Sequence, residues 1–458
     1  MNNKIRRVTL ILLTVLSLMS CKKYLDGKPD KKLVVPSTLR DLQAILDNNN
    51  QINRFKNNGI GEASADNYYL NDNDFNSLYF LSDKSVYTWD KEIFYDNPPG
   101  NNEWSDLYSI VYKANVVLSS INDIRETDQN ASEWKNVKGS ACFFRGYAFS
   151  ILARNYAKAF DKNTGSTDLG IPLRLGTDFN EKSIRASVAQ TYDQIIKDLK
   201  ESVSLLPAIP QHVMRPSKRA AYALLSRVYL FMRDYEDAGS YADSALAINK
   251  TLMDYNDDPS IIANSTVPFM KFNSEVIFHA EGILNPLYNS WANIDSLLYA
   301  SYDSNDLRKT LFFNDHLNGT FGFKGNYTAD VTIFDGIATD EVYLTRAECY
   351  ARTGNKDAAL EYLNSLLIKR WKAGTFIPVI ASDAVDALDK ILIERRKQLL
   401  MRDLRWMDIK RLNKEGANIS LRRTVNGITY SLQPNDNKFA LPLPETIIRI
   451  SGMTQNPR

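Results

Sequence analysis

Hydrophobic side chains recur every three or four residues along much of the chain, which is the spacing of amphipathic helices. One stripe covers residues 104–118, a second covers 134–152 and a third covers 187–206. Ser187 stands where the third helix needs an N-cap, and Pro207 stands where it has to end. The pattern predicts a mostly α-helical fold from about residue 104 onward.

Two segments follow the spacing of the tetratricopeptide repeat, a unit of about 34 residues that folds as two antiparallel helices. The first lies within residues 217–249 and the second covers 346–367. The matching positions are Leu225, Ser226, Tyr229, Ala238, Ala245, Ala347, Tyr350, Gly354 and Ala359. A generic helical hairpin remains the alternative, but two matches favour repeat-like pairs, which have to stack because neither buries its faces alone.

Strand patterns are sparse, and the best candidates are residues 268–280 and 421–432. Residues 250–335 are mostly loop-like, with many Asn, Asp, Gly and Tyr. No linker rich in Pro, Gly or Ser divides the chain, so residues 21–458 are predicted to form one unit. Its parts are an N-terminal part at about 21–215, the hairpin at about 217–249, the loop-rich part at about 250–335 and a C-terminal helical part at about 338–458.

The N-terminus has the pattern of an export signal. Three basic residues precede the twelve apolar-rich residues 8–19, which as a helix would cover about 18 Å, well short of a hydrocarbon core of about 30 Å. Residues 1–20 are therefore predicted to be a signal peptide. The run "LMSC" resembles the lipobox of bacterial lipoproteins and predicts a lipid on Cys21; the alternative is an ordinary signal peptide with a chance cysteine.

The other two cysteines, Cys142 and Cys349, both fall inside helical patterns. Export to an oxidising compartment permits a disulfide between them. Two small buried hydrophobic side chains are the favoured interpretation.

Charge and composition narrow the class of partner. The chain has 56 Lys and Arg against 54 Asp and Glu, and without residues 1–20 the balance is 53 to 54. Phosphate recognition needs a net basic surface, so nucleic acid is not an expected partner. A hydrophobic share of 44% is enough for a large core, which makes the chain a globular protein.

Sequence motifs of common enzyme classes are absent: there is no H-E-x-x-H, G-x-x-x-x-G-K-[ST], G-x-S-x-G or C-x-x-C. The three histidines are far apart, so we expect no metal site, no cofactor and no catalytic residue. The charged segment "ERRKQLLMRDLRWMDIKR", residues 394–411, places charges at helical spacing along one ridge. It fits either a carboxylate-recognition site or, as we favour, buried pairs that hold a helix against its neighbours.

Aromatic residues concentrate in two regions that are also rich in Asn and Asp. The first covers residues 67–101 and the second covers 288–327. Aromatic faces beside amides and carboxylates suit sugar rings and also suit peptides, although many of these rings must belong to the core. Trp89, Tyr95 and Trp291 are the candidate ligand contacts, because each is large and lies near Asn or Asp in a loop-like segment.

Several segments, taken in order, resemble the SusD/RagB family of lipid-anchored outer-membrane nutrient-binding proteins of Bacteroidetes. The likeness covers nearly the whole mature chain. The segments are "CKKYLDGKPD", "WSDLYSIVYKAN", "FFRGYAFSILARNYA", "SVAQTYDQIIKDLKESVSLLP", "RPSKRAAYALLSRVYL", "DEVYLTRAECYARTG", "ERRKQLLMRDLRWMDIKR", "ALPLPETII" and the terminal "QNP". Where the family carries an acidic residue and a Glu-Gly pair in the late helix, this chain has Gln398 and Arg402-Asp403.

The resemblance implies a helical fold with four tetratricopeptide-like hairpins and an irregular, loop-rich ligand-binding face. It implies an anchor in the outer membrane through the lipid, exposure at the cell surface and a SusC-like TonB-dependent β-barrel transporter as partner. It also implies binding rather than catalysis, with an oligosaccharide as the default ligand and a peptide as the other possibility. Two alternatives stay open: a surface glycoside hydrolase, and a tetratricopeptide-type lipoprotein that scaffolds other proteins.

Overall fold

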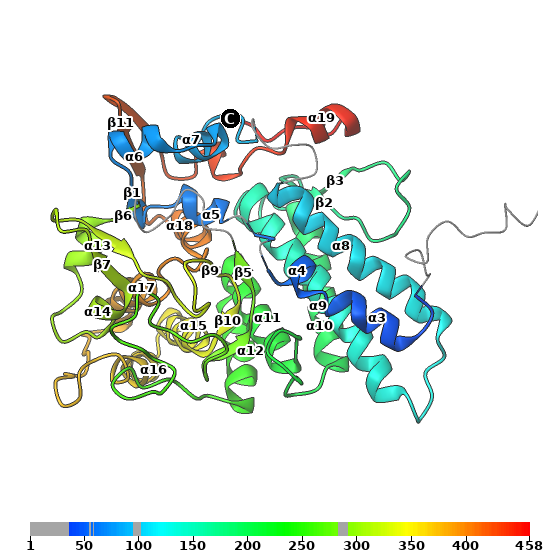
Figure 1. The fold of residues 1–458 in the computed structure, drawn as a ribbon, viewed down its shortest axis with the longest axis horizontal. Helices are drawn as coiled ribbons and strands as arrows, with labels where there is room; N and C mark the ends of the chain where they lie inside the picture. The colour runs from blue at the N-terminus through cyan, green and yellow to red at the C-terminus, as the bar shows by residue number, and fades with distance from the viewer. Residues whose placement is uncertain (1–35, 55, 58, 95–101, 283–291) are drawn as a thin grey trace, which may run out of the picture. The chain divides into compact units, whose positions relative to one another are not determined.

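Three long helices form one side of the helical unit (Figure 1). They are α8 (Glu103–Ser120), α9 (Ala131–Tyr156) and α10 (Val188–Leu205), and α9 packs against both of the others. Each contains one of the predicted stripes. The Ser187 side chain accepts from the Gln190 backbone N–H, and the Gln190 side chain accepts in return from the Ser187 N–H, so a capping box starts α10 as predicted.

The computed structural model describes residues 36–54, 56–57, 59–94, 102–282 and 292–458. Leu39–Arg458 forms one compact unit by its internal contacts. The predicted signal peptide, Cys21, Tyr95 and Trp291 lie outside the described residues. In the part of the chain that is described, no helix is long and apolar enough to cross a bilayer, and no group of side chains has the make-up of a metal site.

The two predicted repeat pairs are helical hairpins that pack on each other. The first consists of α11 (Lys218–Met232) and α12 (Tyr235–Ile248), and the second of α15 (Thr339–Arg352) and α16 (Lys356–Leu367), with α12 against α15. The Ser226 hydroxyl donates to the Ala238 carbonyl oxygen at 2.8 Å, which only small residues permit. Gly354 turns the second hairpin with φ of +83°, a conformation that favours glycine.

Short elements complete the unit. The strands form six two-stranded antiparallel pairs in the described residues, and the predicted 421–432 segment is the hairpin β11 (Leu421–Val425) with β12 (Ile428–Leu432). The remaining pairs are β1 (Tyr68–Tyr69) with β6 (Asn293–Ile294), β2 (Leu169–Pro172) with β3 (Arg185–Ser187), β4 (Val276–Phe278) with β10 (Ile337–Ala338), β5 (Glu281–Gly282) with β9 (Ile333–Phe334), and β7 (Phe313–Asp315) with β8 (Phe321–Phe323). The remaining α-helices are α3 (Leu39–Leu46), α4 (Asn49–Ile52), α5 (Ile60–Ser64), α6 (Asp72–Ser77), α7 (Leu81–Tyr87), α13 (Ser296–Ala300), α14 (Arg308–Phe312), α17 (Ala384–Gln398), α18 (Arg405–Asn413) and α19 (Glu445–Ser451).

The two cysteines that the structure describes do not pair. Cys142 and Cys349 are both buried and free, so the disulfide considered from sequence is absent and the favoured interpretation holds. Burial raises the pKa of each thiol to about 12, which keeps both protonated and makes them small apolar side chains.

The charged segment 394–411 is not one continuous helical ridge, and that part of the prediction is wrong. Between the end of α17 and the start of α18, Met401 and Asp403 adopt positive φ values of 55° and 54°. The break lets adjacent side chains leave in different directions: Arg402 reaches Asp340 of α15, while Asp403 reaches Arg154 of α9. The prediction that the charges make buried pairs is confirmed.

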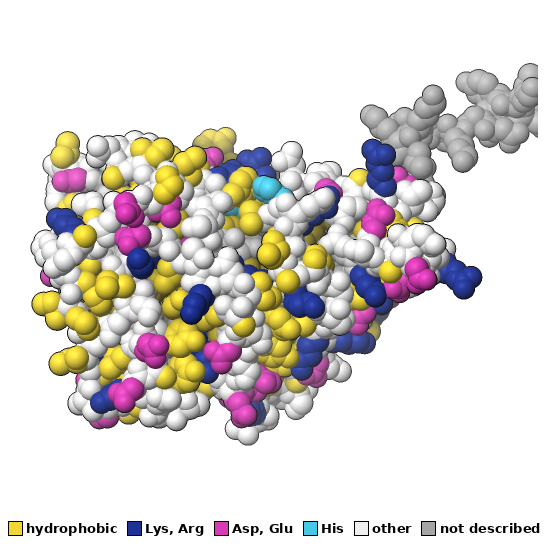
Figure 2. Space-filling model, turned by 90° about the horizontal axis from the view of Figure 1, so that it is seen from below, with side chains coloured by type: hydrophobic (Ala, Val, Ile, Leu, Met, Phe, Trp, Pro, Cys, Tyr) yellow, Lys and Arg dark blue, Asp and Glu magenta, His cyan; other side chains and the backbone are white. Residues whose placement is uncertain are grey.

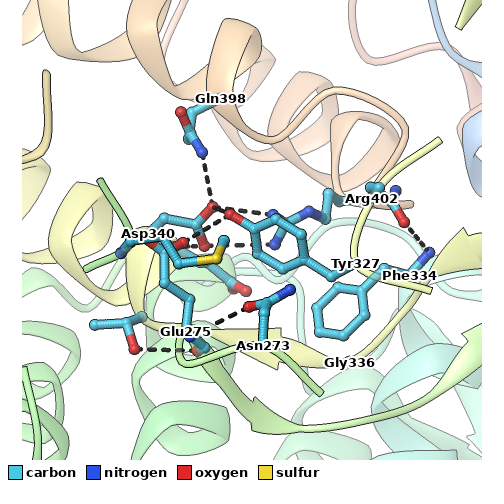
Figure 3. Close-up of polar contacts among 12 residues, drawn as sticks. Asn273, Glu275, Tyr327, Phe334, Gly336, Asp340, Gln398 and Arg402 are labelled. Atoms are coloured by element: carbon cyan, nitrogen blue, oxygen red, sulfur yellow. Dashed lines mark hydrogen bonds and ion pairs between the residues drawn. The ribbon is translucent and has the colours of Figure 1, made fainter. Parts of the chain in front are cut away.

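Figure 3 shows the centre of this cluster. Arg402 Nη2 lies 2.9 Å from Asp340 Oδ2, and Gln398 Nε2 donates to the same oxygen at 2.8 Å. Beside them the Tyr327 hydroxyl donates to Glu275 Oε2 at 2.7 Å, and Arg370 Nη2 lies 2.6 Å from Glu275 Oε1. Burial alone would raise the pKa of Asp340, but the adjacent Arg402 and Arg370 guanidinium groups keep it below its usual value.

A second pair of contacts joins α5 to the same break. Glu62 Oε2 accepts from the Asp403 N–H at 3.0 Å, and Asp403 Oδ1 accepts from the Glu62 N–H at 2.7 Å. Glu62 is completely buried. Burial raises its pKa to about 8, so this carboxyl is largely protonated at neutral pH.

We expect Arg402→Met to lower the free energy of unfolding by about 3–5 kcal/mol, because it leaves the Asp340 carboxylate buried without its closest cation. Adding Asp340→Asn should recover part of this loss, since the unpaired charge is then gone. Urea denaturation of the wild type, the two single variants and the double variant measures the coupling free energy between Arg402 and Asp340. Glu126→Gln, which removes only an exposed pair with Lys135, is the control and should cost less than about 1 kcal/mol. Additive losses in the cycle would contradict the pairing.

Glu62 makes stability depend on pH. Its pKa is raised in the folded state, so its contribution is complete below the unfolded value of about 4.3 and is lost as the pH rises through about 8. Glu62→Gln mimics the protonated form. Urea midpoints should therefore show the variant gaining stability relative to the wild type between pH 5 and pH 8.5. A constant difference across that range would show that Glu62 does not titrate as described.

Candidate functional site

The two aromatic-rich regions predicted from sequence meet at one small sheet. Tyr69 of β1 is the antiparallel partner of Asn293 of β6, although the two are far apart in the chain. Side chains alternate along β1: Tyr68 is buried, whereas Tyr69 is 37% exposed. The sheet therefore presents an aromatic ring outward and fixes it from behind with another.

The hairpin β7–β8 extends this surface. His316, just after β7, has its Nδ1 3.2 Å from Asn293 Oδ1 and 3.0 Å from the Thr320 hydroxyl. Phe321 of β8 stacks on Tyr299 with ring centroids 3.6 Å apart and an interplanar angle of 11°. We define the β1–β6–β8 face as Tyr69, Asn293, Asp295, Tyr299, His316 and Phe321.

The face has one acidic and one basic group close to its aromatic rings. Burial raises the pKa of Tyr69, and the nearby Asp295 carboxylate raises it further. Lys309 lies 5.0 Å from the centroid of the Tyr299 ring. The face thus presents aromatic rings, an imidazole, a carboxylate and an ammonium group, with the amide of Asn293 buried beside them; ring faces and hydrogen-bonding groups of this kind suit neutral polar ligands.

A buried layer holds the face in place. Arg423 of β11 donates to the carbonyl oxygens of Tyr87 and Ala63 and lies over the rings of Tyr87 and Trp89, at 4.1 and 4.7 Å from their centroids. The Tyr68 hydroxyl donates to the Ala63 carbonyl oxygen at 2.7 Å. The side chain that points outward at Tyr69 therefore sits on a rigid base.

Of the three candidate contacts, the structure describes only Trp89. Trp89 is 2% exposed and its Nε1 donates to the Ser64 carbonyl oxygen at 3.0 Å, so its ring belongs to the supporting layer and does not reach a ligand at the surface. Tyr95 and Trp291 lie outside the described residues and stay predictions. The sequence alone could not show whether the Trp89 ring is buried or exposed, because Arg423, which packs on that ring, comes from a distant part of the chain.

Other contributors to the face were not proposed as contacts from sequence. His316 looks like an isolated histidine in the chain, and Asn293 is one amide among many in a loop-rich stretch. They meet because β6 contacts β8. The alternation at Tyr68-Tyr69 is the one local signal that points to an outward ring.

Charges elsewhere on the surface are also mixed. Figure 2 shows Lys and Arg interspersed with Asp and Glu over the aspect that it presents. This agrees with the near balance of 56 basic and 54 acidic residues in the sequence.

Comparison with known proteins gives two matches to family models. Residues 23–230 match the family described as "Starch-binding associating with outer membrane", and residues 337–458 match the "SusD family". Together the two models cover most of the chain.

Individual proteins agree. A SusD-like protein of Formosa agariphila is 20% identical over 92% of this chain and 93% of its own length. A solved structure from Bacteroides vulgatus, described as a putative sugar binding protein, superimposes with a TM-score of 0.74 at 22% identity over 93% of this chain and 99% of its own. A SusD superfamily protein of Bacteroides thetaiotaomicron gives a TM-score of 0.72 at 21% identity, over 92% of this chain and 100% of its own.

If the Tyr69 ring faces outward and is not part of the core, Tyr69→Ala should change the free energy of unfolding, measured by urea denaturation, by no more than about 0.5 kcal/mol. Tyr68→Ala should cost about 3–5 kcal/mol, as is usual for a buried aromatic ring. The two neighbours form a matched pair. Equal losses in the two variants would contradict the inward and outward assignment.

Proposed function

Because this chain belongs to the SusD/RagB family, we propose that it is a lipid-anchored protein of the outer membrane that binds a nutrient at the cell surface. It delivers the bound molecule to a SusC-like TonB-dependent β-barrel transporter. An oligosaccharide is the default ligand, and the β1–β6–β8 face is its binding site. Catalysis is not part of the proposal.

The observation that carries the proposal is the face itself. Tyr69 and the Tyr299–Phe321 stack offer ring surfaces, while His316 and Asp295 stand beside them and the buried Asn293 contacts His316. Sugar rings present both C–H faces and hydroxyl groups, so they match such a surface in both respects. The similar Bacteroides vulgatus structure, described as a putative sugar binding protein, supports the same ligand class.

A peptide is the other ligand to consider, and two other functions compete. A surface hydrolase would turn over an oligosaccharide and lose that activity on a single Asp or Glu substitution. A hydrolase also needs a carboxyl group with a raised pKa as its general acid. Glu62 has a pKa raised to about 8, but it lies in the core and not on the β1–β6–β8 face. A scaffold lipoprotein would bind neither glycan nor peptide.

We expect Tyr69→Ala to weaken oligosaccharide binding at least about tenfold, or about 1.4 kcal/mol, by removing a stacking surface. Calorimetry with the soluble 22–458 form against a panel of oligosaccharides and peptides measures this. Tyr241→Ala, which removes a tyrosine of α12 that stacks on Tyr229, is the aromatic control and should bind as the wild type does. Equal affinity of the Tyr69 variant would remove the face from the proposal.

Cys21→Ser should abolish labelling by a radioactive fatty acid and release the protein from the membrane fraction, because the acyl chains are the proposed attachment. Cys142→Ser is the matched control and should keep both properties. Retained labelling of the Cys21 variant would contradict the anchor.

Protease accessibility on intact cells tests surface exposure. Recovery of the wild type from outer membranes without a barrel partner, in any growth condition, would count against the proposed transporter partner.

A further inference from the structure

A pocket is lined by residues of α8 and α19, two helices that lie at the other end of the unit from β1 and β6 (Figure 1). It has a volume of about 300 Å³ and lies between α8, the loop that joins β2 to β3, and the C-terminal segment with α19. Its apolar lining is dominated by Trp104, Tyr108, Tyr112, Phe179, Ile447 and Met453. We refer to it as the α8 pocket.

The walls of the α8 pocket are fixed by hydrogen bonds. Asn115 Nδ2 donates to the carbonyl oxygens of Arg174 and Gly176, at 2.9 and 3.1 Å. The Tyr108 hydroxyl donates to the Pro172 carbonyl oxygen at 2.8 Å. Trp104, Tyr108 and Asn115 are the residues that stand out in the segment "WSDLYSIVYKAN", so this motif builds a preformed hollow as well as a helix.

Two exposed rings close one side of the hollow. Phe179 of the loop is 78% exposed and Tyr112 of α8 is 37% exposed, and their centroids are 4.8 Å apart. Small-molecule sites are lined mainly by apolar and aromatic side chains, and these two rings add to such a lining. These two rings contribute little to the core and are available to a ligand.

The polar groups of the pocket indicate a neutral ligand. The Arg174 guanidinium is occupied by the carbonyl oxygens of Asp178 and Glu181, with the Glu181 carboxylate 3.7 Å away. Two of its N–H groups are therefore engaged within the loop, and Asp178, whose carboxylate would repel an anion, also lines the pocket. By contrast, Ser105, Thr177 and Ser183 are among the residues that line the pocket, and their hydroxyls make no hydrogen bond to any residue that the structure describes.

We propose that the α8 pocket binds one neutral sugar ring, as a site separate from the β1–β6–β8 face. Aromatic surfaces meet the C–H faces of such a ring, and the three hydroxyls meet its edge. The volume is at the low end of the range for small-molecule sites, about 300–1,000 Å³, and suits a ring rather than a long chain. The proposal rests on the proposed function for its ligand class, since it assumes that sugars are what this protein meets.

The test uses the soluble 22–458 form with D-glucose and D-galactose as probes and D-glucuronate as the charged comparison. Saturation-transfer NMR and crystal soaks report binding. The wild type should bind a neutral hexose in the α8 pocket and reject D-glucuronate. Ser183→Trp, which fills the hollow, and Phe179→Ser, which removes an exposed ring, should each weaken this binding at least about tenfold.

Ile380→Ser is the matched control, because its side chain is 81% exposed in a loop far from the pocket in the chain; it should bind as the wild type does. Unchanged hexose signals in both pocket variants, with Tyr69→Ala still removing oligosaccharide binding, would overturn the pocket alone. No sugar bound by the wild type at any site would overturn the pocket together with the proposed function. Pocket variants that instead lose a barrel partner would identify a protein-docking surface and overturn the sugar site.

Discussion

Arginine side chains inside the helical unit impose the constraint on which the rest of the structure depends. A guanidinium group keeps its charge, so burying one without a carboxylate costs several kcal/mol. Each arginine that is at most 2% exposed in the described residues has such a partner, whereas Arg219 and Arg423, at 7% and 5%, donate to carbonyl oxygens instead. The pairs are Arg154 with Asp403, Arg308 with Asp306 and Glu394, Arg370 with Glu275, Arg395 with Asp408, and Arg411 with Glu348 and Asp408.

This constraint also positions the candidate site. Asp66, next to β1, accepts from Arg405 of α18 at 2.7 Å, and Arg396 of α17 donates to the Asp66 carbonyl oxygen at 2.7 Å. Burial would raise the pKa of Asp66, but Arg405 and Arg396 lower it well below its usual range. The late helices thus hold the strand that carries Tyr69, so the ion pairs stabilise the β1–β6–β8 face from beneath.

Sequence reasoning identified the regular elements well, because periodicity is a local property. The stripes, the Ser187 cap, the two helical hairpins and the strand-forming segment 421–432 all depend on spacing within a few residues of each other. It failed at the break between α17 and α18, where Met401 and Asp403 take positive φ for the sake of distant partners. The sequence also did not show that Trp89 is buried, because Arg423, which packs on its ring, is far away in the chain. For the same reason it did not predict the contact between Asn293 and His316.

The reciprocal contact between Glu62 and Asp403 has a consequence for how the chain matures. It joins residues that are 341 positions apart, and Asn57 with Asp403 spans 346. Contacts between residues so far apart in the chain form late and make folding slower, because a large loop has to close before they can stabilise the structure. Until the last sixth of the chain arrives, α5 and α9 keep unpaired polar groups at their common surface. A chain that ends before Asp403 would therefore leave Glu62, Asn57 and Arg154 without a shared partner in the core.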